Sequence, residues 1–134
     1  MLPDPVALVV TYLRGHPSLT GVTVGTLRPA DLAARLPFLL VERVGGASTL
    51  PTWRPGPILD RAGIGLHGWA GPNLADTRAV IGQALAALYA ARAVALPGGS
   101  IARITPLGGP ITVPDPGAGE HVHRQIATVE VTVH

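Results

Sequence analysis

The longest stretch with the apolar spacing of a helix covers residues 71–93, and it constrains the rest of the chain most strongly. Asn73 is a suitable N-cap, Asp76 lies near the positive end of the helix dipole, and Arg92 lies near the negative end. At about 100° per residue, one face carries a core-facing stripe with two smaller residues beside it: Leu74, Ile81, Leu85 and Leu88, then Thr77 and Ala84. The stretch therefore predicts an amphipathic helix that packs on the core.

The opposite face of this predicted helix is unusual because it carries small residues where a solvated helix usually carries Glu, Lys or Arg. These residues are Ala75, Ala79, Gly82, Gln83, Ala86 and Ala90. Such a face is covered either by a second contact within the chain, with a helix predicted at residues 4–14, or by another subunit. We expect a mixture of both, which makes Ala79, Gly82 and Ala86 candidate interface residues.

The composition leaves more apolar surface than one subunit can cover. The length of 134 residues predicts one domain, residues 1–134, with a core of its own. Hydrophobic residues make up 47% of the chain, charged residues only 13%, and the mean hydropathy is +0.38. The longest nearly apolar run, residues 79–91, is too short to span a membrane, and the first residues lack a signal-peptide pattern. We therefore expect oligomerisation to bury the surplus.

Charge and cysteine content argue against two classes of protein. The ten basic residues are all Arg, are scattered singly, and nearly balance eight acidic residues, so the net charge is only +2. Because a nucleic-acid-binding surface gathers its cations on one element, we expect no sequence-specific binding of nucleic acid. The absence of Cys fits folding in a reducing compartment rather than a disulfide framework.

The remaining patterns predict an α+β fold with one mostly antiparallel sheet and two helices packed on one of its faces. The expected order is α-β-β-β-α-β-β, and it starts with a helix over residues 4–14 that Asp4 caps and Pro5 opens. The predicted strands are residues 21–26, 38–44, 58–70, 100–105 and 125–133. In the last strand, four alternate residues are expected to face the core: Ala127, Val129, Val131 and Val133.

Two segments are rich in Gly and Pro: residues 45–57 are predicted to be a loop or an extended hairpin tip, and residues 106–120 are predicted to be a loop. Trp53 and Arg54 in the first segment either pack back on their own subunit or anchor a partner, and both interpretations stay open. We expect this segment to act as a contact arm. One side of the strand at residues 58–70 carries three further interface candidates: Arg61, His67 and Trp69.

No catalytic motif is predicted. The chain has no Lys for a phosphate-binding loop, no Cys nucleophile, and no Ser in the glycine setting of a nucleophile elbow. Asp60 and Asp76 could form a pair of carboxylates, but Asp76 is already explained by its place in a first helical turn. We therefore expect a non-enzymatic protein with no catalytic residue and no cofactor.

His121 and His123 have a metal-like spacing, since residues i and i+2 of a strand point to the same side. A third ligand would have to come from elsewhere, for example from His67 or His134, and Glu120 is the nearby carboxylate. A polar loop that enters the last strand is the favoured interpretation, because no Cys, Asp or Glu other than Glu120 lies nearby at ligand spacing. The sequence therefore predicts no metal site.

Four phrases that cover nearly the whole chain carry a resemblance to a known family. They are PDPVALVVTYLRGHP, VTVGTLRPADLAARLPFLLVERVGG, ILDRAGIGLHGWA running into NLADTRAVIGQALAALYAA, and ITVPDPGAGEHVHRQIATVEVTVH. In these phrases and in the order of its predicted elements, the chain resembles the tail terminator (tail completion) proteins of long-tailed bacteriophages, especially those that infect high-GC actinobacteria. The family has no catalytic signature, so the likeness is one of pattern.

The resemblance implies a structural virion protein. Members form hexameric rings that cap the last ring of the tail tube, stop its polymerisation and offer a surface to the neck proteins of the head. For this chain the implied partners are further copies of itself, the major tail (tube) protein and a head-closure or neck protein. DNA would pass through the lumen without sequence-specific binding, and the protein would be assembled into virions in the host cytoplasm, away from any membrane.

Two alternatives stay open. Within phages, the chain could be another neck component, such as a head-closure or minor capsid protein. Outside phages, it could be a small oligomeric α+β ligand-binding domain or an enzyme. An apolar pocket with several convergent polar groups would favour that second class.

Overall fold

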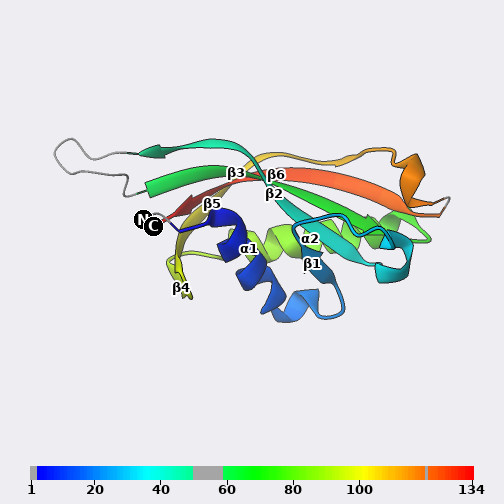
Figure 1. Ribbon diagram of the computed structural model, residues 1–134, viewed down its shortest axis with the longest axis horizontal. Helices are drawn as coiled ribbons and strands as arrows, with labels where there is room; N and C mark the ends of the chain where they lie inside the picture. Colours follow the sequence, from blue (N-terminus) through cyan, green and yellow to red (C-terminus); the bar gives the residue numbers. More distant parts are fainter. Residues whose placement is uncertain (1–2, 50–58, 120) are drawn as a thin grey trace.

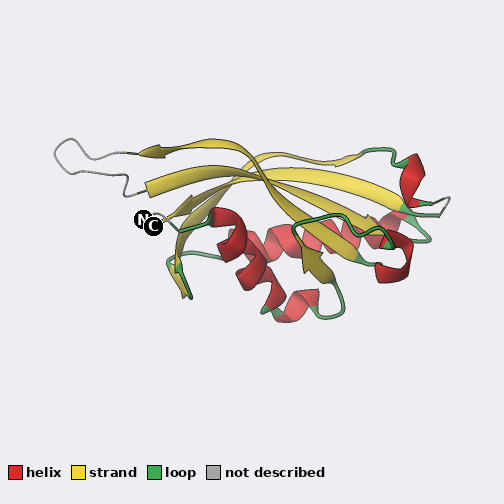
Figure 2. Cartoon of the chain, in the orientation of Figure 1, coloured by secondary structure: helices red, strands yellow, loops and turns green. Residues whose placement is uncertain are grey.

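The computed structural model describes residues 3–49, 59–119 and 121–134. Two helices cover one face of a curled, six-stranded sheet (Figure 1, Figure 2). The helices are α1 (Pro5–Arg14) and α2 (Leu74–Tyr89), with three short 3₁₀ helices, η1 (Pro17–Leu19), η2 (Leu32–Arg35) and η3 (Pro116–Ala118). The strands are β1 (Thr23–Gly25), β2 (Phe38–Thr49), β3 (Leu59–Ala70), β4 (Val94–Leu96), β5 (Gly99–Thr112) and β6 (His123–Val133). The predicted α+β fold class is confirmed.

The strand order across the sheet is β1-β2-β3-β6-β5-β4. β1 pairs with β2 in parallel, and all other neighbouring strands in this sheet are antiparallel. The two edge strands are short: β1 pairs only with residues 38–40 of β2, and β4 pairs only with residues 99–101 of β5. The body of the sheet is therefore the four long strands, with β3 and β6 at its centre.

The main core lies between the helices and the sheet. α2 contributes the buried residues Thr77, Val80, Ile81, Ala84, Leu85, Ala87 and Leu88. They face alternate residues of the central strands, including Ile64, Leu66, Val129 and Val131, which are fully buried. The predicted apolar stripe is thus confirmed, although Leu74 is only half-buried and the helix ends at Tyr89 rather than near residue 93.

Hydrogen bonds from two hydroxyl groups fix the helices in place. Thr77 is fully buried, and its Oγ1 lies 3.2 Å from the carbonyl oxygen of Ala70 and 3.0 Å from that of His123. This contact joins the start of α2 to the ends of both central strands. Tyr12 in α1 donates from its hydroxyl to the carbonyl oxygen of Ala87 in α2 at 2.7 Å. Because a buried polar group is costly unless it is paired, these contacts favour one register of the helices.

The sheet extends further than the sequence predicted. β5 continues to Thr112 through a segment predicted to be a loop, β2 continues to Thr49 beyond its predicted end, and β4 was not predicted. β5 tolerates Pro106 and Pro110 because its outer side is largely unpaired, and register shifts interrupt its pairing with β6. The prediction of a loop was therefore wrong for residues 106–112.

Gly46 allows β2 to continue past an irregularity in its pairing with β3. The register between β2 and β3 shifts between Arg43 and Gly45. Gly46 has a φ of 102°, and a Cβ atom at this position would collide with the carbonyl oxygen of Arg61. Glycine is therefore required for the strand rather than a sign of a loop.

Across this irregularity, a partly buried ion pair joins β2 to β3. The Nη1 and Nη2 atoms of Arg43 donate to the two carboxylate oxygens of Asp60 at 2.7 and 2.8 Å. Asp60 is 3% exposed, whereas the side chain of Arg43 is 37% exposed. The hydrogen bonds to Asp60 raise the pKa of Arg43 above its ordinary value. The pair therefore joins β2 to β3 across the register shift, since Arg43 precedes the shift and Asp60 pairs with Ser48 after it.

We expect Arg43→Met to lower the free energy of unfolding by about 1–2 kcal/mol, because the Asp60 carboxylate would stay buried without its two donors while water reaches only part of the site. Arg35→Met is the matched control. Its partner Asp31, at 2.9 Å, is exposed, and surface pairs of this kind contribute little. Urea unfolding followed by circular dichroism measures both variants. Equal losses would show that the buried pair is no stronger than a surface pair.

Candidate assembly surfaces

The outer face of α2 is exposed, and it carries the small residues that the sequence analysis identified. All of them are exposed: Ala75, Ala79, Gly82, Gln83, Ala86 and Ala90. A Cβ atom at Gly82 would meet no atom within 4 Å. α1 reaches α2 through Tyr12 and the backbone of Ala87, which is buried. Within one chain, therefore, α1 does not cover this face, and the subunit seam stays a prediction.

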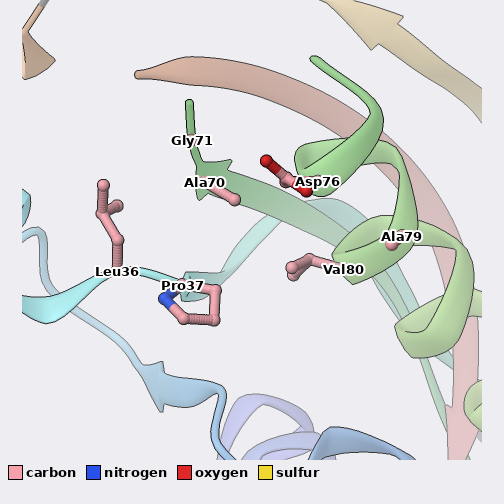
Figure 3. A pocket seen from close by; sticks show the side chains of 7 residues that line it. All are labelled: Leu36, Pro37, Ala70, Gly71, Asp76, Ala79 and Val80. Atoms are coloured by element: carbon pink, nitrogen blue, oxygen red, sulfur yellow. The ribbon is translucent and has the colours of Figure 1, made fainter. Parts of the chain in front are cut away.

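A hollow of about 290 Å³ adjoins this face at the start of α2. Figure 3 shows Leu36 and Pro37 on one side and the α2 residues Asp76, Ala79 and Val80 on the other, with Ala70 and Gly71 above. Asp76 is the one charged residue of the lining, and its carboxylate already accepts a hydrogen bond from the backbone N–H of Asn73 at 3.0 Å. The hollow is thus shaped for an apolar group rather than for a polar ligand.

Trp69 lies in a second, smaller apolar cluster on the sheet face opposite the helices. We call it the Trp69 cluster; it consists of Leu32, Phe38, Leu40, Trp69 and Ala118, from β2, β3, η2 and η3. Trp69 is 2% exposed, and its Nε1–H donates to Asp115 at 2.8 Å. Its side chain therefore packs within its own subunit. This differs from the sequence-based expectation that Trp69 would be an interface residue.

Asp115 connects this cluster to two arginines. Arg28 donates to the Asp115 carboxylate at 2.8 Å, and the guanidinium groups of Arg28 and Arg124 lie 5.7 and 6.0 Å from the centre of the Trp69 ring. Burial raises the pKa of Asp115, but the hydrogen bonds from Trp69 and Arg28 outweigh it, so the pKa lies below its ordinary value of 3.8. The connection before η2 and the segment after β5 are thus held together over Trp69.

The other interface candidates have different environments. Arg61 is exposed on β3. His67 is half-buried, with its Nε2 2.7 Å from Glu42 Oε1, and its ring is stacked on Trp69 at 5.9 Å. Trp53 and Arg54 lie outside the residues that the structure describes, so the contact arm stays a prediction.

The two histidines with metal-like spacing do not share a strand. β6 begins at His123, whose Nε2 lies 3.1 Å from the carbonyl oxygen of Pro72, whereas His121 is exposed in the preceding turn. His67 pairs with Ile126 within the sheet, and His134 follows the far end of β6. In residues 3–49, 59–119 and 121–134, no three His, Asp or Glu side chains are grouped so that they could hold a metal ion.

No helix in the described part of the chain has both the length and the apolar character needed to cross a membrane. This finding concerns α1 and α2, of which the longer, α2, has 16 residues.

Comparison with known proteins shows that the fold is similar to that of a phage protein. No family model and no curated protein matches the sequence. Among solved structures, the fold is similar to that of the bacteriophage SPP1 gp17 protein, with a TM-score of 0.56 and 14% sequence identity. The match covers 96% of this chain and 87% of that chain. At this identity the similarity establishes a shared fold, over nearly the full length of both proteins.

We expect the stability of the protein to fall on acidification partly through Asp115. Because its folded pKa is lowered, Asp115 stabilises the fold above its unfolded pKa, and this contribution is lost as the pH falls from about 4 through the lowered value. Asp115→Asn should therefore be less stable than the wild type at pH 7 and should lose less stability between about pH 5 and pH 3. Thermal unfolding at several pH values measures this, and parallel curves for the two proteins would contradict it.

Proposed function

We propose that this chain is a tail terminator: a structural virion protein of a long-tailed bacteriophage that forms a ring on the end of the tail tube. The observation that carries the proposal is the fold similarity to a bacteriophage protein over 96% of the chain. It agrees with the separate resemblance of the sequence to the tail terminator family. In that family the ring is a hexamer, which stops tube polymerisation and offers a joining surface to the head and neck.

The outer face of α2 supports assembly into a ring. Among the exposed residues of α2, only Arg78 is charged, and the small residues around Gly82 allow another backbone to approach closely. The apolar hollow beside Ala79 and Val80 continues this surface. A ring closes through heterologous contacts, so each copy needs two different lateral surfaces, and burying them would remove the apolar excess of the isolated chain.

The geometry also supports a structural role rather than an enzymatic one. Asp60 and Asp76, the carboxylates that could have formed a catalytic pair, are engaged with Arg43 and with the backbone of Asn73 respectively. The hollow at α2 has a single carboxylate, that of Asp76, in an otherwise apolar lining. Binding sites for small molecules usually combine several convergent polar groups. The alternative of a ligand-binding domain or enzyme is therefore less well supported.

The proposed axial partners are the major tail tube protein on one side of the ring and a head-closure or neck protein on the other. DNA would pass through the lumen without sequence-specific contact, which fits the balanced net charge of +2. The protein would assemble in the host cytoplasm and remain in the virion. A neck component other than the terminator would bind the head side but would not cap tube ends.

The proposal is tested by assembly. Mass photometry of the purified protein and electron microscopy after co-expression with the tail tube protein of the same phage should show rings, free or at one end of tubes of limited length. Protein that stays monomeric alone and is absent from tube ends would refute the proposal. Protein found only at the head connector would favour a head-closure role.

We expect Gly82→Arg to leave the subunit folded and to prevent or weaken ring formation. A side chain at this position meets no atom of its own subunit, and replacing Gly within a helix adds up to about 1 kcal/mol of stability. In a ring, the long cation would lie in the seam. Gly82→Ala is the control, since it makes the same backbone change without the bulk. Rings of normal mass from Gly82→Arg would show that this face of α2 is not at the seam.

A further inference from the structure

The sheet has two long edges that no strand of the described chain covers. β1 pairs only with residues 38–40, so the outer side of β2 has no partner strand beyond Leu40. β4 pairs only with residues 99–101, so the outer side of β5 has none from Arg103 to Thr112. Unpaired backbone N–H and C=O groups along such an edge are a template for a further strand.

The two open edges lie in the same rows of the sheet. Residues 42–47 of β2 pair with residues 61–65 of β3, and these pair with residues 128–132 of β6. Residues 128–132 in turn pair with residues 103–108 of β5. The short strands block opposite ends: β1 lies at one end of the β2 edge, and β4 lies at the other end of the β5 edge. Both edges are therefore free at the same height along the strands.

Each of these edge segments contains one residue more than the segment with which it pairs. On β2 the extra residue is Val44, at the register shift between Arg43 and Gly45. On β5 it is Leu107, at the shift between Pro106 and Gly108. Both side chains are apolar and more than half exposed, at 55% for Val44 and 57% for Leu107. Two exposed apolar bulges thus lie on opposite edges at almost the same height.

We propose that the β2 edge of one copy of this chain docks against the β5 edge of the next copy, with Val44 of the first packed on Leu107 of the second. This inference rests on the proposed ring and specifies its seam. Exposed apolar residues at an edge are a liability in a monomer, and a second copy whose own apolar bulge lies in an adjacent row covers both.

Strand direction agrees with this contact. β2, β3, β6 and β5 alternate in direction, so β2 and β5 of one sheet run antiparallel to each other. A rotation about an axis along the long strands preserves those directions, so the β2–β5 junction between copies would also be antiparallel. Because α2 contacts β5, a copy that docks on the β5 edge also comes close to α2 of its neighbour.

Backbone pairing at this junction is short. Pro106 and Pro110 have no N–H to donate, and the bulges interrupt the ladder on both sides. The contact therefore depends more on the side chains of Val44 and Leu107 than on a continuous run of hydrogen bonds. Such an edge pairs poorly with an arbitrary strand, which protects the isolated chain against aggregation while leaving the matched contact available.

Disulfide trapping tests the contact directly, because the chain has no cysteine of its own. Within one subunit, positions 44 and 107 are separated by three strand spacings, about 14 Å, so they cannot form a disulfide with each other. Under mild oxidation, the double variant Val44→Cys/Leu107→Cys should give a covalent ladder from dimer up to the closed ring. Each single variant alone should stay monomeric, and an equimolar mixture of the two should stop at the dimer.

The controls separate this inference from the proposed function. Val44→Cys/Ile111→Cys is the matched control: Ile111 is 58% exposed on the same β5 edge, but it pairs with Ile126, whereas Val44 lies beside the rows of Val129 and Glu130, so no ladder is expected. If mass photometry shows wild-type rings but the double variant gives no ladder, the seam is wrong and the ring stands. Dimers from Val44→Cys alone would show a symmetric β2–β2 contact and overturn the inference. If no rings form, alone or on tubes, the proposed function fails and the seam with it.

Discussion

The close packing of α2 on the two central strands is the constraint on which the rest of the structure depends. At Gly68 in β3, an added Cβ atom would lie 2.9 Å from Cγ1 of Ile81, so the Ile81 side chain packs directly on the backbone of β3 where the strand has no side chain of its own. Thr77 then fixes the position of the helix along the strands through the carbonyl oxygens of Ala70 and His123. With α2 held in this way, α1 completes a single helical layer on one face of the sheet.

A single helical layer leaves surfaces that the chain does not cover. The opposite sheet face is covered at one end only, where η2 and η3 close over Trp69. The outer face of α2 and the edges of β2 and β5 stay open in the isolated chain. In most solvated surfaces such regions carry much charge, but here the exposed charged residues are few, Arg78 on α2 and Arg43 and Arg103 on the strand edges, and most of their neighbours are small or apolar. The surfaces with few charged residues are thus the ones that the proposed ring of copies would bury.

Sequence patterns predicted elements well wherever the pattern is local. The cap at Asp4 and the proline after it placed α1 correctly, and Asn73 was correctly identified as the N-cap of α2. The sequence patterns gave the wrong secondary structure in the segments rich in Gly and Pro, because Gly and Pro are found both in loops and in bulged strands near a sheet edge. Whether residues 106–112 form a strand depends on β6 lying beside them, and β6 lies further along the chain.

The sequence by itself determined the fold class, both helices and the core-facing residues of β6, because periodicity and capping act between residues a few positions apart. It also determined that the outer face of α2 has almost no charge. Only the tertiary structure decided that Trp69 is buried, since this depends on Asp115 and on η2 and η3, which close over it from distant parts of the chain. It alone placed Val44 and Leu107 in adjacent rows, because strand register arises from pairing between segments and is not encoded in either segment alone.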